Sequence, residues 1–208
     1  MTFLSRLFAL FPAFHVCLIL SAFYLLIINP SLLSLILWIA SIYLFPLFCF
    51  RLLNFFTPIE EGKSDILAKK FSPWWAGHQI QLLFISVPFL EAILRMIPGL
   101  YSQWLRFWGS KIGKHVYWTP GSVHYDRNLL EVGDRVVFGE RSLSVCHVIT
   151  PKGSSAELTI TKIKLGTGAF VGAACVLSPG VKMDDFSFVK AGTRVYPNEH
   201  IPKKNQNK

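Results

Sequence analysis

Cysteine is scarce and widely spaced in this chain of 208 residues. The four cysteines, Cys17, Cys49, Cys146 and Cys175, form no Cys-x-x-Cys pair. Closely spaced cysteines are typical of disulfide frameworks, zinc ribbons and dithiol redox sites. Their absence argues against those classes, and we expect four reduced thiols that pack as small apolar side chains.

The sequence also lacks the usual marks of nucleotide and nucleic-acid binding. It contains no phosphate-binding loop of the P-loop type, and no run of lysine and arginine is interleaved with aromatic residues. The chain is nevertheless basic, with 21 Lys and Arg against 12 Asp and Glu and a net charge of +9. Membrane lipids with anionic headgroups are therefore the expected partners, and nucleic acid is not.

Charged residues are absent from one long stretch, because Leu7 through Phe50 contains no Asp, Glu, Lys or Arg. A helix that spans a bilayer needs about 20 apolar residues, so this stretch is long enough for two. The turn formers Asn29-Pro30-Ser31 divide it. We therefore predict a transmembrane helical hairpin in residues 1–56, with helices over Leu7–Ile28 and Leu32–Phe50.

Positive residues flank this hairpin on one side only. Arg6 precedes the first helix and Arg51 follows the second, whereas the turn between the helices has no positive charge. Lys and Arg are enriched in the cytoplasmic flanks of membrane helices. We expect a multi-pass protein of the inner (cytoplasmic) membrane, with the region after the hairpin on the cytoplasmic face.

A connector, residues 57–108, follows the hairpin. It starts with polar residues and continues as an apolar stretch in which Trp74-Trp75 suit the boundary between membrane and water. Pro88 predicts a break in any helix there, and Glu91 and Arg95 have the spacing of an i,i+4 ion pair. These features favour interfacial helices over a third complete span.

Aliphatic residues recur at every sixth position in the last part of the chain, and small or branched residues stand four places after most of them. A period of six fits neither an α-helix nor an alternating strand. It is the period of a parallel β-helix, in which each hexapeptide supplies one short strand and one corner. The sixth-position residues are Leu165, Val171, Leu177, Met183, Val189, Val195 and Ile201, and the smaller ones are Ala169, Cys175, Val181, Ser187 and Thr193.

The same period is present upstream with two interruptions. Its phase slips by two residues near Leu130, and the turn formers within Thr150–Glu157 predict a loop. We predict a β-helix over residues 109–202 and a basic tail at 203–208. An amphipathic helix at Leu100–Trp108 is expected to cap the first coil, because the open ends of such repeats need a cover.

Several short motifs accompany these repeats, and together they resemble the hexapeptide-repeat acyltransferases. The motifs are Ile112-Gly113, His124-Tyr125-Asp126, Glu131-Val132-Gly133-Asp134, Phe138-Gly139 and His147. The resemblance covers about half of the chain. It implies a left-handed β-helix, a homotrimer, an acyl-thioester donor held between neighbouring β-helices, and a histidine that acts as general base on the acceptor.

Spacing within the repeats identifies a candidate base. Three hexapeptides make a coil of about 18 residues. Asp126 and His147 are 21 residues apart, which becomes about 19 after the two-residue slip is removed, so they should lie one rung apart at the same corner. A carboxylate beside an imidazole fixes its tautomer and suits a base of near-neutral pKa. We name His147 as the candidate base and Asp126 as its partner, with His124 as an alternative base and Glu131 as an alternative partner.

Residues of the later coils are candidates for binding the donor. Gly168, Gly172 and Ala173 leave room for a pantetheine arm that lies close to the backbone. Lys190 and Arg194 have the charge to meet a nucleotide phosphate, although solvated corners are an equally simple interpretation of both.

The sequence thus predicts a membrane-bound acyltransferase. It would move an acyl group, expected to be acetyl, from acyl-CoA or an acyl-carrier-protein thioester to a hydroxyl or amine of an amphipathic or lipid-linked acceptor. No permanently bound cofactor and no metal site are expected, since His115, His124 and His147 lack the close spacing of zinc ligands. A non-enzymatic trimeric membrane scaffold and a zinc-dependent hydratase remain as alternatives.

Overall fold

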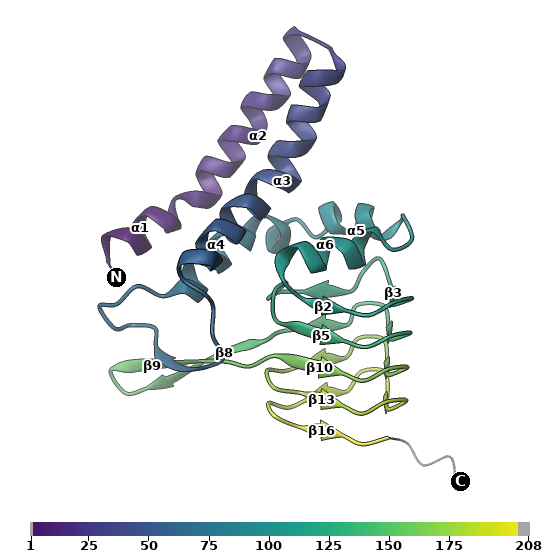
Figure 1. Ribbon diagram of the computed structural model, residues 1–208. Helices are drawn as coiled ribbons and strands as arrows, with labels where there is room; N and C mark the ends of the chain where they lie inside the picture. The colour runs from purple at the N-terminus through teal and green to yellow at the C-terminus, as the bar shows by residue number, and fades with distance from the viewer. Residues whose placement is uncertain (1, 204–208) are drawn as a thin grey trace. The chain divides into compact units, whose positions relative to one another are not determined.

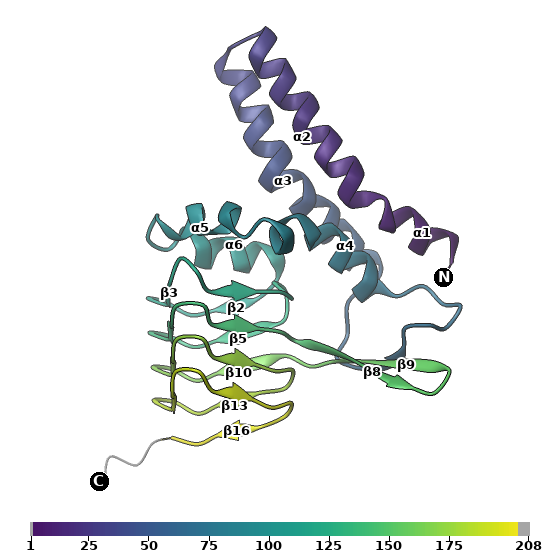
Figure 2. The same ribbon diagram turned by 180° about the vertical axis from the view of Figure 1, so that it is seen from behind.

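The computed structural model describes residues 2–203 and is shown from opposite sides in Figures 1 and 2. The chain forms two compact units. One extends to Ile59 and includes Leu67–Ser86, and the other contains Glu60–Ile66 and the chain from Val87 onward. The basic tail predicted at 203–208 lies outside the described residues, except for Lys203.

Helices make up the first unit, which contains α1 (Phe3–Ala9), α2 (Phe11–Ile28), α3 (Leu32–Phe56) and α4 (Pro73–Ser86). The segment from α1 through α2, and α3 by itself, are long and apolar enough to cross a bilayer, with mean hydropathies of 2.2 and 2.3. In the most apolar 18 residues of each segment, only 6% and 22% of the residues are buried. Such exposure of apolar side chains is what a surface facing lipid requires.

The helical hairpin extends beyond the predicted limits at both ends. The first helical segment starts at Phe3 and is interrupted at Leu10, and α3 continues past Arg51 to Phe56. Charge limits the part of a helix that lipid can cover, but it does not interrupt backbone hydrogen bonding. Within the hairpin, the ring nitrogen Nε2 of His15 lies 2.9 Å from the carbonyl oxygen of Ser41, so this buried imidazole faces α3.

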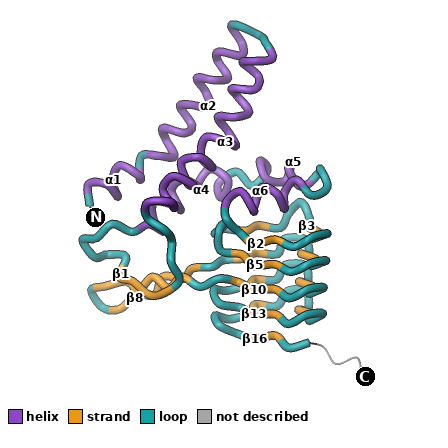
Figure 3. The backbone as a smooth tube through the Cα atoms, viewed as in Figure 1, coloured by secondary structure: helices purple, strands orange, loops and turns teal. Residues whose placement is uncertain are grey.

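Short parallel strands form the main body of the second unit, and Figure 3 shows them alternating with loops. They align in three faces. Face I contains β2 (Lys111–Ile112), β5 (Leu130–Val132), β10 (Ile163–Leu165), β13 (Lys182–Met183) and β16 (His200–Ile201). Face II contains β3 (Tyr117–Trp118), β6 (Val137–Phe138), β11 (Phe170–Val171) and β14 (Phe188–Val189). Face III contains β4 (Val123–His124), β7 (Leu143–Ser144), β12 (Val176–Leu177) and β15 (Arg194–Val195). Because the chain visits the three faces in turn and every strand pair within a face is parallel, it winds as a parallel β-helix. We call this three-sided body the prism, and the turns between its faces the corners.

Strand register gives the length of each coil. In the last coils, Leu165 pairs with Met183 and Met183 with Ile201, which confirms the 18-residue turn. Ile112 pairs with Val132, 20 residues later, and Val132 pairs with Leu165, 33 residues later. The additional two and fifteen residues both enter between a face III strand and the next face I strand, so one corner of the prism carries both insertions.

The interior of the prism is filled by the residues that the six-residue period identifies. Leu165, Val171 and Leu177 are at most 4% exposed, and their counterparts in the next coil are also buried. In the first coils larger rings take these places, and Trp118 stacks on Phe138 with 4.4 Å between ring centroids. Burial of each such side chain contributes about 1.5–3 kcal/mol.

Two further helices, α5 (Phe89–Arg95) and α6 (Leu100–Trp108), lie over the first coil (Figures 1 and 2). The side chain of Arg106 donates hydrogen bonds to the carbonyl oxygens of Ile112 and Gly113, at 2.9 and 2.8 Å. The indole nitrogen of Trp118 donates to the hydroxyl of Ser102 at 2.9 Å. The predicted cap is therefore present, and the apolar side of α6 closes the end of the prism.

The prediction of a loop at Thr150–Glu157 is wrong. The segment belongs to a β-hairpin, β8 (His147–Lys152) and β9 (Ser155–Ile160), which turns at Gly153 with φ at 58°. A third strand, β1 (Gly62–Asp65), comes from the connector and pairs antiparallel with β9. Gly153 and Ser154 join β8 to β9, so these turn formers mark the turn of a hairpin and not a loop. The strand β1 is distant in sequence from β9, and no local pattern indicates that pairing.

Gly172 lies where successive coils touch, since a Cβ atom there would be 2.5 Å from the backbone nitrogen of Ala191. We expect Gly172→Val to lower the free energy of unfolding by about 1–3 kcal/mol, because the coils would be forced apart. Unfolding in detergent by denaturant measures this. Ala173→Val, at an exposed neighbouring position, is the control and should leave stability unchanged. Equal stability of the two variants would contradict the coil spacing.

Candidate active site

The corner that carries the insertions brings Asp126 and His147 together. Asp126 follows β4 in the two-residue insertion, and His147 is the first residue of β8 in the longer one. The ring nitrogen Nδ1 of His147 lies 2.7 Å from Oδ2 of Asp126. The backbone nitrogen of Cys146 donates to the same oxygen at 2.8 Å. The contact inferred from the spacing of the repeats is thus confirmed.

Burial constrains this pair. The Asp126 side chain is 4% exposed and the His147 side chain 16%. An ionised carboxylate can only accept a hydrogen bond, so we assign the ring proton to Nδ1 of His147. The ring is then fixed in orientation, and proton exchange with a substrate falls to Nε2.

Cys146 lies beside the pair and is fully buried. Burial first, and then the charge of Asp126, raise the pKa of its thiol well above the ordinary value. Because the thiolate is the reactive form, a buried thiol with a raised pKa is poorly reactive, and its Sγ donates to the carbonyl oxygen of Leu129 at 3.5 Å.

His124 lies inside the prism rather than at the corner. Its side chain has no exposed surface, and its ring meets those of Trp118 and Phe138 edge to face at 4.8 and 4.9 Å. Burial, followed by the charges of Arg95 and Arg127, lowers its pKa well below the ordinary value. A neutral imidazole sealed in this way has no route to a substrate, so we assign it to the core and not to the role of alternative base.

Glu131 faces outward on face I and does not contact His147. Its carboxylate forms ion pairs with Lys111, Lys162 and Lys164 at 3.3–3.5 Å. Burial raises the pKa of Glu131, but the hydrogen bond from Lys162 and the other lysine charges outweigh it, and the resulting pKa is below the ordinary value. The alternative partner is therefore engaged elsewhere.

The room predicted beside Gly168 and Gly172 is taken by the chain itself. A Cβ atom at Gly168 would meet the ring of Phe186, and one at Gly172 would meet the backbone of Ala191. Gly168 also adopts the left-handed region, with φ at 67°. These two glycines allow the coils to stack. The prediction that they leave room for a pantetheine arm is therefore wrong, because residues of the next coil fill that space.

The other donor candidates are at the surface. Ala173, Lys190 and Arg194 are exposed. Arg194 belongs to β15 and is in register with Val176 on the outer side of face III. Their role in donor binding stays a prediction.

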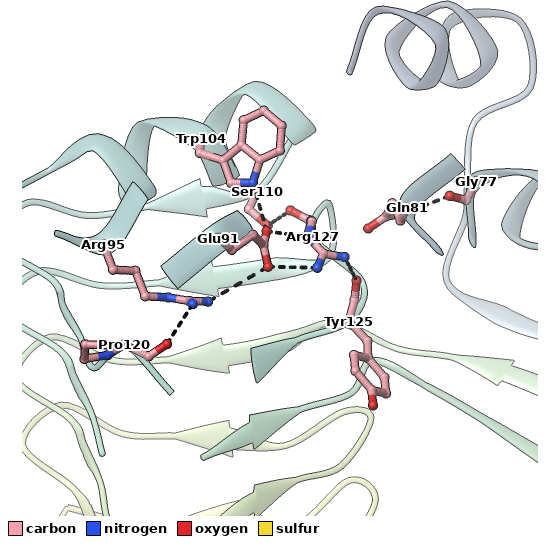
Figure 4. A network of polar contacts seen from close by, with 9 residues as sticks. All are labelled: Gly77, Gln81, Glu91, Arg95, Trp104, Ser110, Pro120, Tyr125 and Arg127. Carbon is pink, nitrogen blue, oxygen red and sulfur yellow. Dashed lines mark hydrogen bonds and ion pairs between the residues drawn. The ribbon is translucent and has the colours of Figure 1, made fainter. Parts of the chain in front are cut away.

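Sequence reasoning missed two sets of contacts. In one, His200 lies 2.8 Å from Asp184, but both side chains are about half exposed, at 58% and 47%. In the other, Arg127 is fully buried and is held by Glu91, in the network of Figure 4. The i,i+4 spacing of Glu91 and Arg95 indicated only the weaker contact, which measures 3.9 Å.

No protein-family model matches the sequence, and no curated protein matches it. Among solved structures, a hexapeptide-repeat-containing acetyltransferase from Vibrio cholerae, complexed with acetyl coenzyme A, is 16% identical with a TM-score of 0.43. The matched region covers 57% of this chain and 80% of the acetyltransferase chain. A maltose O-acetyltransferase from Clostridium difficile is 15% identical with a TM-score of 0.38 over 58% and 83% of the two chains. A galactoside acetyltransferase in complex with coenzyme A is 14% identical with a TM-score of 0.38 over 57% and 78%. Identities of 14–16% and TM-scores of 0.38–0.43 are too low to carry a functional argument, so the function has to be argued from the residues of this chain.

The buried imidazole of His124 predicts acid-sensitive stability. Its pKa in the folded chain lies below the value of about 6.5 in the unfolded chain, so the unfolded chain takes up a proton first as the pH falls. Stability is lost below about pH 6.5, by up to about 1.4 kcal/mol per pH unit. We expect His124→Leu to remove this loss, which thermal unfolding between about pH 7.5 and 5.5 would measure. Parallel pH dependences in the two proteins would contradict a neutral His124.

Proposed function

We propose that this protein is a membrane-bound acyltransferase in which His147 is the general base. The 2.7 Å contact between His147 and the buried carboxylate of Asp126 carries the proposal. The donor is acyl-CoA or an acyl-carrier-protein thioester, the transferred group is acetyl, and no cofactor is permanently bound. This function accords with the resemblance of the repeats to the hexapeptide-repeat acyltransferases, and with it we propose a left-handed winding.

The chemistry requires one proton to be moved twice. Nε2 of His147 accepts the proton of the acceptor hydroxyl or amine as its oxygen or nitrogen attacks the thioester carbonyl carbon. Asp126, which holds Nδ1–H, stabilises the imidazolium that forms. When the tetrahedral intermediate collapses, the carbon–sulfur bond breaks and the imidazolium returns the proton to the thiolate. The acceptor leaves acylated, and the histidine is neutral again.

The acceptor is proposed to be amphipathic or linked to a lipid. The exposed apolar surface of the hairpin supports this choice, because a chain held at the bilayer meets such acceptors without diffusion through bulk water. The flanking charges at Arg6 and Arg51 support a cytoplasmic location for the second unit.

A homotrimer is part of the proposal, and face II is the surface that we assign to subunit contacts. The outward residues of this face are apolar, with Tyr117, Phe170 and Phe188 at 60%, 42% and 40% exposed. Face I instead presents charged groups such as Lys164 and Lys182. A contiguous apolar column in water favours cover by another copy of the chain.

Removal of the base should abolish turnover without unfolding the protein. We expect His147→Gln to reduce kcat by about 100- to 10,000-fold, because a positioned base contributes that much to the rate. Asp126→Asn should reduce it less, since the amide oxygen can still accept from Nδ1. Release of coenzyme A thiol from acetyl-CoA in the presence of membrane-lipid acceptors measures the rate.

His200→Gln is the matched control, because His200 also contacts a carboxylate but its side chain is about half exposed. It should keep the wild-type rate. Undiminished transfer by His147→Gln would overturn the assignment. A wild-type protein that neither binds nor cleaves any acyl thioester would favour the non-enzymatic scaffold.

The proposed interface has a separate test. We expect Phe170→Glu to dissociate the trimer, because the carboxylate would have to be buried in an apolar contact. Sedimentation of the full chain in detergent measures the assembly. Lys182→Glu on face I should remain trimeric, and a trimeric Phe170→Glu protein would contradict the choice of face II.

A further inference from the structure

The turn that carries Asp126 is anchored by its neighbour Arg127. The Arg127 side chain has no exposed surface, and its Nε and Nη2 atoms donate to the two carboxylate oxygens of Glu91 at 2.6 and 2.8 Å. Its third nitrogen, Nη1, donates to the carbonyl oxygen of Tyr125 at 3.1 Å. The guanidinium therefore ties the residue before Asp126 to helix α5 of the cap, as Figure 4 shows.

Glu91 is itself held in place by the cap. The indole nitrogen of Trp104, on α6, donates to Oε1 of Glu91 at 2.9 Å. Arg95 lies 3.9 Å from Oε2, and its Nη1 atom donates to the carbonyl oxygen of Pro120. The Glu91 carboxylate thus contacts Trp104 on α6 and Arg95 on α5 as well as Arg127. Of these residues, Arg127 alone belongs to the turn of Asp126.

The other side of the turn is fixed by backbone contacts. The hydroxyl of Ser110 donates to the carbonyl oxygen of Arg127 at 2.7 Å and accepts from the backbone nitrogen of Leu130 at 3.0 Å. The backbone nitrogen of Leu129 donates to the carbonyl oxygen of Asp126 at 2.9 Å. Moving the backbone of Asp126 away from His147 would require these bonds or the Arg127–Glu91 pair to break.

We propose that Glu91 and Arg127 are positioning residues, which hold Asp126 so that it fixes the tautomer and orientation of His147. This inference rests on the proposed role of His147 as base. A two-pronged guanidinium–carboxylate contact defines direction as well as distance, and an apolar contact would not. Buried ion pairs contribute little net stability relative to apolar packing, so a positional role is a sufficient reason for one here.

Arg127 and Arg95 allow a matched comparison, because both contact Glu91 but only Arg127 belongs to the turn of Asp126. We expect Arg127→Met to lower kcat by about 10- to 100-fold with little change in KM, as displaced catalytic groups do. Arg127→Lys, which keeps the positive charge but cannot donate the two parallel hydrogen bonds, should recover part of the rate. Arg95→Met should keep the wild-type kcat, since Glu91 retains Arg127 and Trp104.

A spectroscopic measurement separates this inference from the proposed function. Solid-state NMR of the full chain in lipid, labelled with ¹⁵N-histidine, reports which ring nitrogen of His147 carries the proton. The signal is identified by its loss in His147→Gln. We expect Nδ1–H in the wild type and in Arg95→Met, and a mixture of tautomers in Arg127→Met. If Arg127→Met does not fold, the tautomer of His147 is measured in Arg127→Lys instead, where we also expect a mixture.

An unchanged tautomer and unchanged kcat in the Arg127 variants would overturn the positioning role. Equal losses in Arg95→Met and Arg127→Met would also overturn it, because they would show a general effect of the cap. If His147→Gln keeps full activity, the proposed function fails, yet the tautomer of His147 in Arg127→Met still decides whether the cap positions the pair.

Discussion

Parallel backbone pairing between successive coils is the constraint on which the second unit depends. Each strand on the three faces of the β-helix contributes only two or three residues, so none of these strands is stable without the neighbouring coils. Register is held by residues such as Gly172, where neighbouring backbones approach too closely for a side chain. Additional residues can be accommodated only where pairing is not needed, at a corner. The insertions that hold Asp126 and His147 occur at the same corner, so the constraint on winding also explains how the pair comes together.

The repeat made much of this predictable. A period of six identified the buried positions from Leu165 onward, and an 18-residue coil allowed a sequence separation to be converted into a contact. The contact between Asp126 and His147 follows from counting, because β-helices relate distance along the chain to height in the prism in a nearly linear way. The limits of α6 were predictable as well, since its apolar residues recur at helical spacing between Gly99 and Gly109.

Other features depend on partners that no local pattern identifies. The strand β1 is the polar segment Gly62–Asp65, without alternation, and it forms because β9 offers an edge. The hairpin β8–β9 contains Pro151 and Gly153, which are ordinarily typical of loops. Glu91 and Arg127 are separated by 36 residues, and they meet only after a cap helix has packed on the first coil. His124 occupies a position expected to be aliphatic, and aromatic neighbours accommodate it.

The far end of the prism has its own consequence for solubility. Within residues 2–203, the outer sides of β14, β15 and β16 pair with no further strand, and unpaired backbone groups of this kind are a template on which a foreign strand can add. Each of these strands is only two residues long, and the chain leaves β16 through Pro202, which has no N–H to donate, and the charged Lys203. A guest strand would gain few hydrogen bonds and would meet a charge, which discourages end-to-end polymerisation.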